Sequence, residues 1–175
     1  SIRTQEEFAK LRAIGRIVRA ALDRTAAAVR PGITTAELDA IGARVLEEHG
    51  AESAPPKVYG FPGALCISVN DEAIHGIPGG RVICDGDLVK LDLVAEKDGY
   101  FADAAVTVTV GAVGDTAREL VRCAESGFWQ AARPAKAAEA PMSLRKLRRS
   151  TPFCSGAACR GNSSAKNSSK ASLRA

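Results

Sequence analysis

Two aspartates in the middle of the chain are spaced so that their carboxylates can meet. The runs LVKLDLVAE (88–96) and YFADAAVTVTV (100–110) are typical of β-strands, and Asp98-Gly99 between them is a strong signal for a two-residue hairpin turn. With that turn, the numbers of paired residues sum to 197. Because side chains alternate along a strand, Asp92 and Asp103 project from one face as a diagonal pair, with backbones roughly 7 to 8 Å apart.

Two close carboxylates repel each other unless a cation lies between them. A divalent metal is one explanation, since carboxylate oxygens suit Mn, Mg, Fe or Zn, and sites with two metals use bridging carboxylates. The alternative is a solvated hairpin face on which both aspartates are merely polar. Lys90 lies on the same face and could neutralise one of them. The hairpin alone leaves both interpretations open.

The chain has only two histidines, His49 and His75. His75 stands directly before the turn cluster GIPGG (76–80), which makes it a candidate for a functional role. His49 falls in the last turn of a predicted helix, where a partly positive imidazole suits the helix dipole, so it is left out of the site. The five cysteines are odd in number and lack the paired spacing of a disulfide framework, which indicates reduced thiols.

Two predicted helices, a run of short strands and a third predicted helix follow one another along the chain, the segregated order of an α+β domain. Capping-box pairs, in which Thr precedes Glu by three residues, start predicted helices over 5–29 and 35–49. ALCISV (64–69) is β-like and begins the sheet. A third helix starts at Asp115 or Thr116 and runs to about 130, with an apolar stripe expected to face inward: Leu120, Val121, Ala124 and Phe128.

The last 45 residues differ in composition from the rest of the chain. Residues 131–175 hold ten Lys or Arg and a single acid, so their net charge is +9, whereas residues 1–130 carry −5. We therefore divide the chain into a domain over 1–130 and a basic, Ser/Ala-rich, disordered tail over 131–175. A shifted reading frame near 131–140 is one explanation of the tail. A basic arm for RNA or the ribosome surface is another.

No run approaches the roughly 18 to 20 apolar residues that span a bilayer, and the first residues do not resemble a signal peptide. We therefore expect a cytoplasmic protein without a membrane partner.

Over residues 3–130 the sequence resembles the methionine aminopeptidases of the bacterial type. The resemblance rests on RPGITTAELD (30–39), on YGFPGALCISVNDEAIHGIP (59–78) and on DGDLVKLDLVAEKDGYFADAAVTVTVG (85–111), in that order. It implies the N-terminal half of a pita-bread (creatinase/aminopeptidase) fold, in which helices flank an antiparallel sheet. It also implies a metal-dependent exopeptidase that removes the initiator methionine from nascent polypeptides.

The resemblance also assigns roles to individual residues. Asp92 and Asp103 match two aspartates that bind the metal ions, the second of which bridges both. The family site holds two divalent ions, and the sequence does not distinguish Co, Mn, Fe or Zn. His75 matches a histidine of the substrate site. Tyr59, Phe61 and Cys66 match positions near the methionine pocket, although core packing explains these three residues equally well.

The sequence departs from the family after residue 130. The family draws a histidine ligand, two glutamate ligands and a further substrate-facing histidine from the second half of its fold, and the HGIG block expected there is missing. We therefore expect a truncated chain that is inactive alone. The alternatives are a catalytically silent binding module for nascent chains or ribosomal RNA, and a translation or assembly artefact with no role. A nucleic-acid partner is expected only through the 131–175 tail.

Overall fold

The computed structural model describes residues 2–137. The predicted disordered tail starts at residue 131, but residues 131–137 are helical, and the rest of the tail, 138–175, lies outside the described part. Two compact units divide the chain at residues 132 and 133, and the core and the sheet belong to the first. The elements of the described residues follow in the order α1 (Gln5–Ala28), α2 (Thr35–Glu48), β1 (Glu52–Ser53), α3 (Ala54–Tyr59), β2 (Cys66–Val69), β3 (Leu88–Lys97), β4 (Tyr100–Thr109) and α4 (Asp115–Ala137).

Both predicted capping boxes are present at the starts of α1 and α2. The Thr4 hydroxyl accepts a hydrogen bond from the Glu7 amide at 3.1 Å, and the Glu7 carboxylate accepts one from the Thr4 amide at 2.9 Å. Thr34 and Glu37 make the same reciprocal pair at the start of α2, at 3.2 and 2.8 Å. Two amides that a helix start would leave unpaired are thus satisfied in each helix.

The hairpin of β3 and β4 has the register that the sequence predicts. Lys97 pairs with Tyr100 across the Asp98-Gly99 turn, and the ladder continues without a break to Leu88 and Thr109. β1 and β2 both pair with the other edge of β3, so every neighbour of β3 is antiparallel to it. Among the described strands, β4 has no partner besides β3, and its second edge is therefore unpaired.

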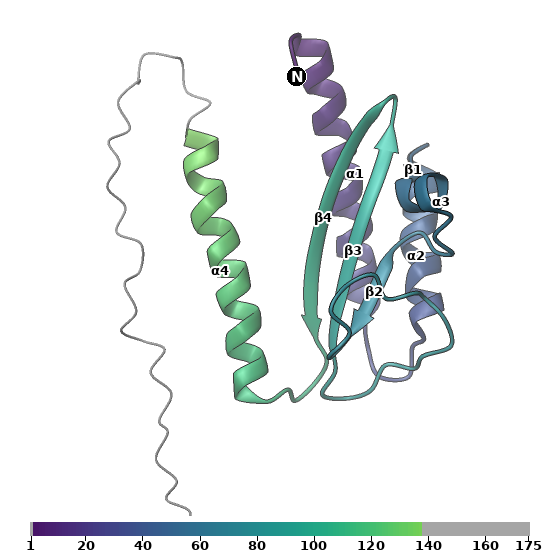
Figure 1. Cartoon of the computed structure of the whole chain (residues 1–175), viewed down its shortest axis with the longest axis vertical. Coiled ribbons are helices and arrows are strands. Elements are labelled where there is room, and N and C mark those ends of the chain that lie inside the picture. Colours follow the sequence, from purple (N-terminus) through teal and green to yellow (C-terminus); the bar gives the residue numbers. More distant parts are fainter. Residues whose placement is uncertain (1, 138–175) are drawn as a thin grey trace, which may run out of the picture. The chain divides into compact units, whose positions relative to one another are not determined.

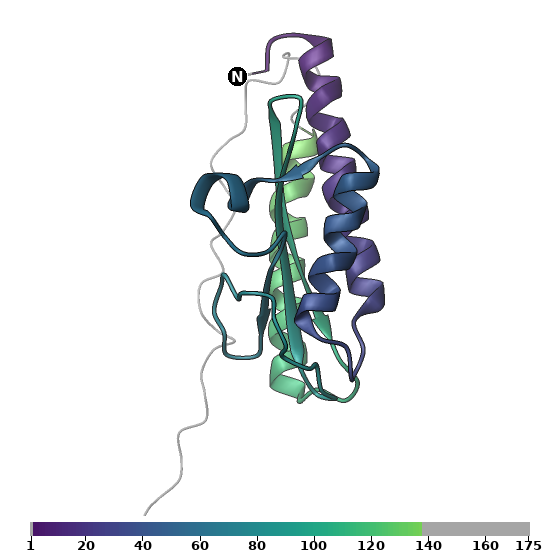
Figure 2. The same ribbon diagram turned by 90° about the vertical axis from the view of Figure 1, so that its right-hand side faces the viewer.

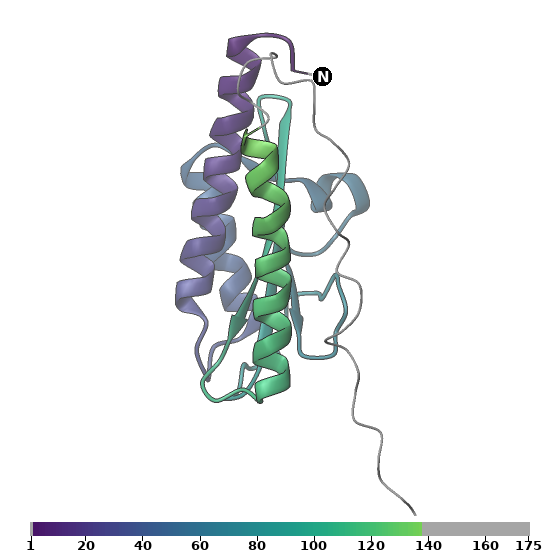
Figure 3. The same cartoon turned by 90° about the vertical axis from the view of Figure 1, so that its left-hand side faces the viewer.

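One face of the sheet is covered by α1 and α2, as the side view in Figure 2 shows. Figures 1 and 3 show α1 running along the β3–β4 hairpin. Every second residue of β3 points into this layer and is fully buried: Val89, Leu91, Leu93 and Ala95. They pack against α1 and α2 side chains that include Ile14, Val18, Leu22, Leu38 and Val45. Each large side chain buried here contributes about 1.5 to 3 kcal/mol to folding.

The opposite face of β3 bears the side chains between these core residues, and this side of the sheet carries loops instead of long helices. Figure 2 shows α3 and the loops around β2 on this side, across the sheet from α1 and α2. The sequence did not predict β1 or α3. Pro55 and Pro56 lie in the first turn of α3, where a missing amide hydrogen is tolerated.

The prediction for α4 is wrong in two respects. The helix runs on to Ala137 instead of ending near residue 130. Its apolar side chains also do not face inward, because Leu120 is 67% exposed and Phe128 is 63% exposed. Helical periodicity shows which side chains share a face, but it does not show whether a neighbouring element covers that face.

No helix of the described part is long and apolar enough to cross a membrane.

Candidate metal and substrate site

Asp92 and Asp103 project from the same face of the hairpin, as predicted. In the ladder Asp92 pairs with Ala105, and Asp103 pairs with Val94. This is the face turned away from α1 and α2, since the neighbours of Asp92 along β3 are core residues. Asp92 is half-buried and Asp103 is exposed. The two carboxylates are therefore on one side of the sheet, at diagonal positions of adjacent strands.

The surroundings of Asp92 disfavour its charged form. Burial raises the pKa of the Asp92 carboxyl, and the negative charge of Asp103 raises it further, whereas His75 acts in the opposite direction. Two carboxylates held this close repel each other. A divalent cation bound between them would relieve that repulsion.

Lys90 is not the counter-ion of this pair. Its ammonium group donates hydrogen bonds to the backbone carbonyls of Asn70, at 3.1 Å, and Glu72. None of the ion pairs in the described part of the chain includes Asp92 or Asp103. Lys90 therefore does not neutralise either aspartate in this structure. Its ammonium group instead anchors the loop that leads to His75.

Cys66 lies beside Asp92 on the next strand. β2 and β3 pair Cys66 with Asp92, so Cys66, Asp92 and Ala105 form a row across three strands. The Cys66 side chain is 8% exposed. Burial raises the pKa of its thiol, and the charges of nearby aspartates, first among them Asp92, raise it further. A buried thiol beside Asp92 suits the wall of a substrate site.

His75 is held in an exposed loop by contacts of its neighbour, Gly76. The backbone of His75 has a φ of +57°, which is uncommon for a residue with a side chain. Gly76 accepts a hydrogen bond from the Ile67 amide at 2.9 Å and donates one to the Ser68 hydroxyl at 3.0 Å. The turn after His75 therefore lies directly against β2, on the strand that also carries Cys66.

Tyr59 and Phe61 differ in burial. Tyr59, at the end of α3, is 82% exposed, so core packing does not explain it. Phe61 is half-buried, and for it both core packing and a substrate contact stay open.

The ligand set of the described residues is incomplete for a metal ion. No group of three or more His, Cys, Asp or Glu side chains within residues 2–137 is placed to hold one. Two carboxylate donors fit a divalent ion in kind but fall short in number, since such ions take four or more ligands. The roles of Asp92 and Asp103 as ligands, and of His75, Tyr59, Phe61 and Cys66 as substrate contacts, remain predictions.

We next compared the chain with known protein families. The model of metallopeptidase family M24 matches residues 9–148, which is most of the chain. The chain belongs to metallopeptidase family M24. The predicted pita-bread fold is thereby confirmed, with helices flanking an antiparallel sheet. Divalent metal ions are the cofactors of an M24 metallopeptidase.

The relatives of this M24 chain include several methionine aminopeptidases. Methionine aminopeptidase 2 of Bacillus subtilis is 42% identical over 137 residues, which cover 78% of this chain and 55% of that protein. Methionine aminopeptidase of Staphylococcus epidermidis is 50% identical over 110 residues, covering 63% and 44%. The solved structure of methionine aminopeptidase from Rickettsia prowazekii superposes with a TM-score of 0.66 at 32% identity, covering 70% of this chain and 49% of that one.

This M24 chain spans about half the length of the relatives it matches. The sequence resemblance to methionine aminopeptidases is confirmed for that part. The division of the chain at residue 130 remains a prediction.

Proposed function

We propose that this chain contributes Asp92, Asp103 and His75 to a metal-dependent aminopeptidase site that removes the initiator methionine from nascent proteins. The observation that carries the proposal is the pair of carboxylates on one face of the β3–β4 hairpin, with Lys90 bonded elsewhere. Relatives named methionine aminopeptidases support the choice of substrate. The expected substrates are ends of nascent chains, in the cytoplasm and near the ribosome.

In this proposal Asp92 and Asp103 hold divalent ions through their carboxylate oxygens. A complete site of this family holds two such ions, of which Co, Mn, Fe and Zn are the candidates. When bound, divalent ions supply a nucleophilic water at neutral pH and polarise the peptide carbonyl. His75 contacts the peptide near the bond that is cut. Tyr59, Phe61 and Cys66 form the pocket for the methionine side chain, a lining role that suits the neutral thiol of Cys66.

Two carboxylates leave most coordination positions of a divalent ion to water. We therefore expect the 175 residues alone to bind one ion weakly and to have little aminopeptidase activity. A two-metal hydrolase needs both ions at a fixed spacing, and the sequence offers no histidine besides His49 and His75 to supply an imidazole ligand.

Calorimetric titration with Mn(II) tests the metal site. The parent chain should bind one ion, and Asp103→Asn should weaken the binding at least tenfold, which corresponds to about 1.4 kcal/mol. Asp98→Asn is the matched control, since Asp98 lies in the turn of the same hairpin and away from the pair. Equal binding by the parent and Asp103→Asn would remove Asp103 from the site.

Hydrolysis of a Met-Ala-Ser peptide with Co(II) or Mn(II) tests the expected inactivity. We expect the purified chain to turn over far more slowly than an ordinary enzyme, for which rates on the order of 1 per second or above are typical. A rate in that range, abolished in His75→Ala, would contradict the expectation. The missing ligands would then come from elsewhere, for example from a second chain.

The alternative function is a catalytically silent module that binds nascent chains or ribosomal RNA. The charge of +9 on residues 131–175 favours it, and most of these residues lie outside the described part. Counterion release makes binding to RNA by such a segment strongly dependent on salt. RNA binding by the full chain that falls steeply with rising salt, without Mn(II) binding, would support this alternative over the peptidase.

A further inference from the structure

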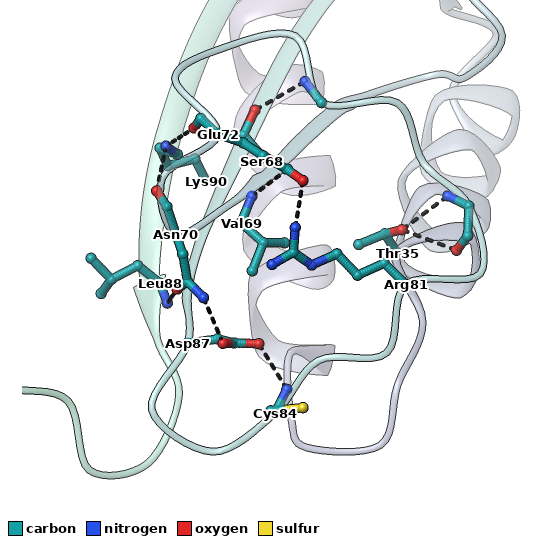
Figure 4. Close-up of polar contacts among 12 residues, drawn as sticks. Thr35, Ser68, Val69, Asn70, Glu72, Arg81, Cys84, Asp87, Leu88 and Lys90 are labelled. Carbon is teal, nitrogen blue, oxygen red and sulfur yellow. Dashed lines mark hydrogen bonds and ion pairs between the residues drawn. The ribbon is translucent and has the colours of Figure 1, made fainter.

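Two loops carry the candidate substrate residues, and both are anchored on one helix. Residues 60–65 link α3 to β2 and contain Phe61, and residues 70–80 follow β2 and contain His75. Neither loop has regular pairing of its own along its length. Their conformation therefore depends on the side chains that hold them, several of which Figure 4 shows.

Thr35, in the first turn of α2, holds the end of the His75 loop. Its hydroxyl donates a hydrogen bond to the Gly79 carbonyl at 3.0 Å and accepts one from the Gly79 amide at 2.9 Å. Figure 4 shows this reciprocal pair. The side chain of Thr35 is 2% exposed, so water does not replace these bonds when they break. The Ala36 amide adds a third bond to the Gly79 carbonyl, at 2.9 Å.

Asp39, one turn further along α2, holds the other loop. Its Oδ1 atom accepts hydrogen bonds from the amides of Ala64 and Leu65, at 2.9 and 2.7 Å. Burial raises the pKa of the Asp39 carboxyl, and these two bonds act against that rise. No Lys or Arg of the described residues forms an ion pair with Asp39. Its only described polar partners are therefore the backbone of this loop.

The two loops also touch each other between these anchors. A Cβ atom added to Gly63 would lie 2.8 Å from the Cγ atom of Pro78 and 3.3 Å from the Oδ1 atom of Asp39. Gly63 is buried, so the contact is closed to water. Because Thr35 and Asp39 are four residues apart, they lie on one face of α2. One helical turn thus holds the Gly79 end of the His75 loop and the Ala64–Leu65 end of the other loop, and the loops contact each other at Gly63 and Pro78.

We propose that Thr35 and Asp39 are positioning residues that set the relative placement of His75 and Phe61 on the two loops. They act through the backbone of Gly79, Ala64 and Leu65. The placement itself follows from the hydrogen bonds, and only its meaning for substrate binding rests on the proposed function. The sequence analysis did not identify either residue.

The test measures the loops directly in the full chain without metal. Thr35→Val keeps the shape of the side chain and removes both bonds to Gly79, whereas Thr35→Ser keeps the hydroxyl. We expect Thr35→Val to shift the NMR signals of the His75 ring and to speed amide exchange of Gly79 about tenfold, as loss of a hydrogen bond does. In Thr35→Ser the His75 ring signals and the exchange rate of the Gly79 amide should stay close to those of the parent. Asp39→Ala should speed exchange of the Ala64 and Leu65 amides.

Thr25→Val is the matched control, because Thr25 is also a fully buried helical threonine but its hydroxyl has no partner among the described residues. His75 signals that are unchanged in Thr35→Val, or that move equally in Thr25→Val, would overturn the proposal. If Thr35→Val fails to fold, amide hydrogen exchange in the parent tests the proposal instead. Amides of Gly79, Ala64 and Leu65 that are unprotected from exchange in the parent would also overturn the proposal. None of these readouts needs metal or activity, so failure of the proposed function would leave them unaffected.

Discussion

Gly76→Ala should destabilise the protein strongly, although Gly76 does not use a backbone conformation reserved for glycine. A Cβ atom at this position would lie 2.2 Å from the Ile67 carbonyl oxygen and 2.8 Å from the Ser68 Cα atom, both in the backbone of β2. Ordinary contact between such atoms needs about 3.5 Å. The loop must therefore move away from β2 by about 1 Å, because a strand paired to β3 yields less than a loop does.

This movement breaks two hydrogen bonds. They join the Ile67 amide to the Gly76 carbonyl at 2.9 Å, and the Gly76 amide to the Ser68 hydroxyl at 3.0 Å. Each bond contributes about 1 kcal/mol net, and a buried polar group left unpaired costs about 1 to 3 kcal/mol. Ser68 is 3% exposed, so its hydroxyl is such a group. We expect the free energy of unfolding to fall by about 2 to 4 kcal/mol.

Urea unfolding of the parent and the variant measures this change. Gly80→Ala is the matched control in the same loop, because a Cβ atom there would meet nothing within 4 Å. We expect the control to stay within about 0.5 kcal/mol of the parent. A loss below about 1 kcal/mol in Gly76→Ala would mean that the loop moves cheaply, and the reasoning that contact with β2 holds His75 would be wrong.

Three further changes test other parts of the fold. Thr25→Val should raise the free energy of unfolding by about 1 kcal/mol in urea, since it removes a buried hydroxyl without a partner in the described residues; a loss would indicate an unseen partner. Hydrogen bonds from Thr34 lower the pKa of Glu37, so its contribution to stability should be present above the ordinary value and lost as pH falls through the lowered one. The free energy of unfolding, measured in urea across this pH range, should depend less on pH in Glu37→Gln than in the parent. We expect concentration-dependent association through the exposed Leu120 and Phe128 side chains and through the edge of β4 that no described strand pairs. Sedimentation should show less association in Phe128→Glu.

Local signals were sufficient to predict much of the fold. The Asp98-Gly99 turn fixes the register of β3 and β4, since a two-residue loop leaves one way to pair the strands. Thr4 and Thr34 mark the starts of α1 and α2, because their hydroxyls cap amides only three residues away. In each case the interacting groups are close in sequence, so the pattern contains both partners.

Contacts between distant residues could not be predicted in this way. Asp39 bonds to amides some 25 residues further along the chain, and nothing in its own segment indicates them. Lys90 was placed on the correct face, but its long side chain reaches the carbonyls of the His75 loop instead of Asp92. For α4 the sequence shows an apolar stripe, but it does not show whether another element covers that stripe. The same limit applies to the candidate site, where the pair of aspartates could be predicted and the anchors of the loops could not.

The turn between β3 and β4 also bears on the order of events during folding. Asp92 and Asp103 are separated by only ten residues, and pairing around Asp98-Gly99 needs no other part of the chain. Hairpins of this kind form in about 1 to 10 μs, long before distant strands and helices assemble. The two carboxylates therefore approach each other at an early stage, and their repulsion opposes the step that starts the sheet. If the pair binds a divalent ion as proposed, that ion would screen this repulsion and would act on the rate of folding as well as on the finished site.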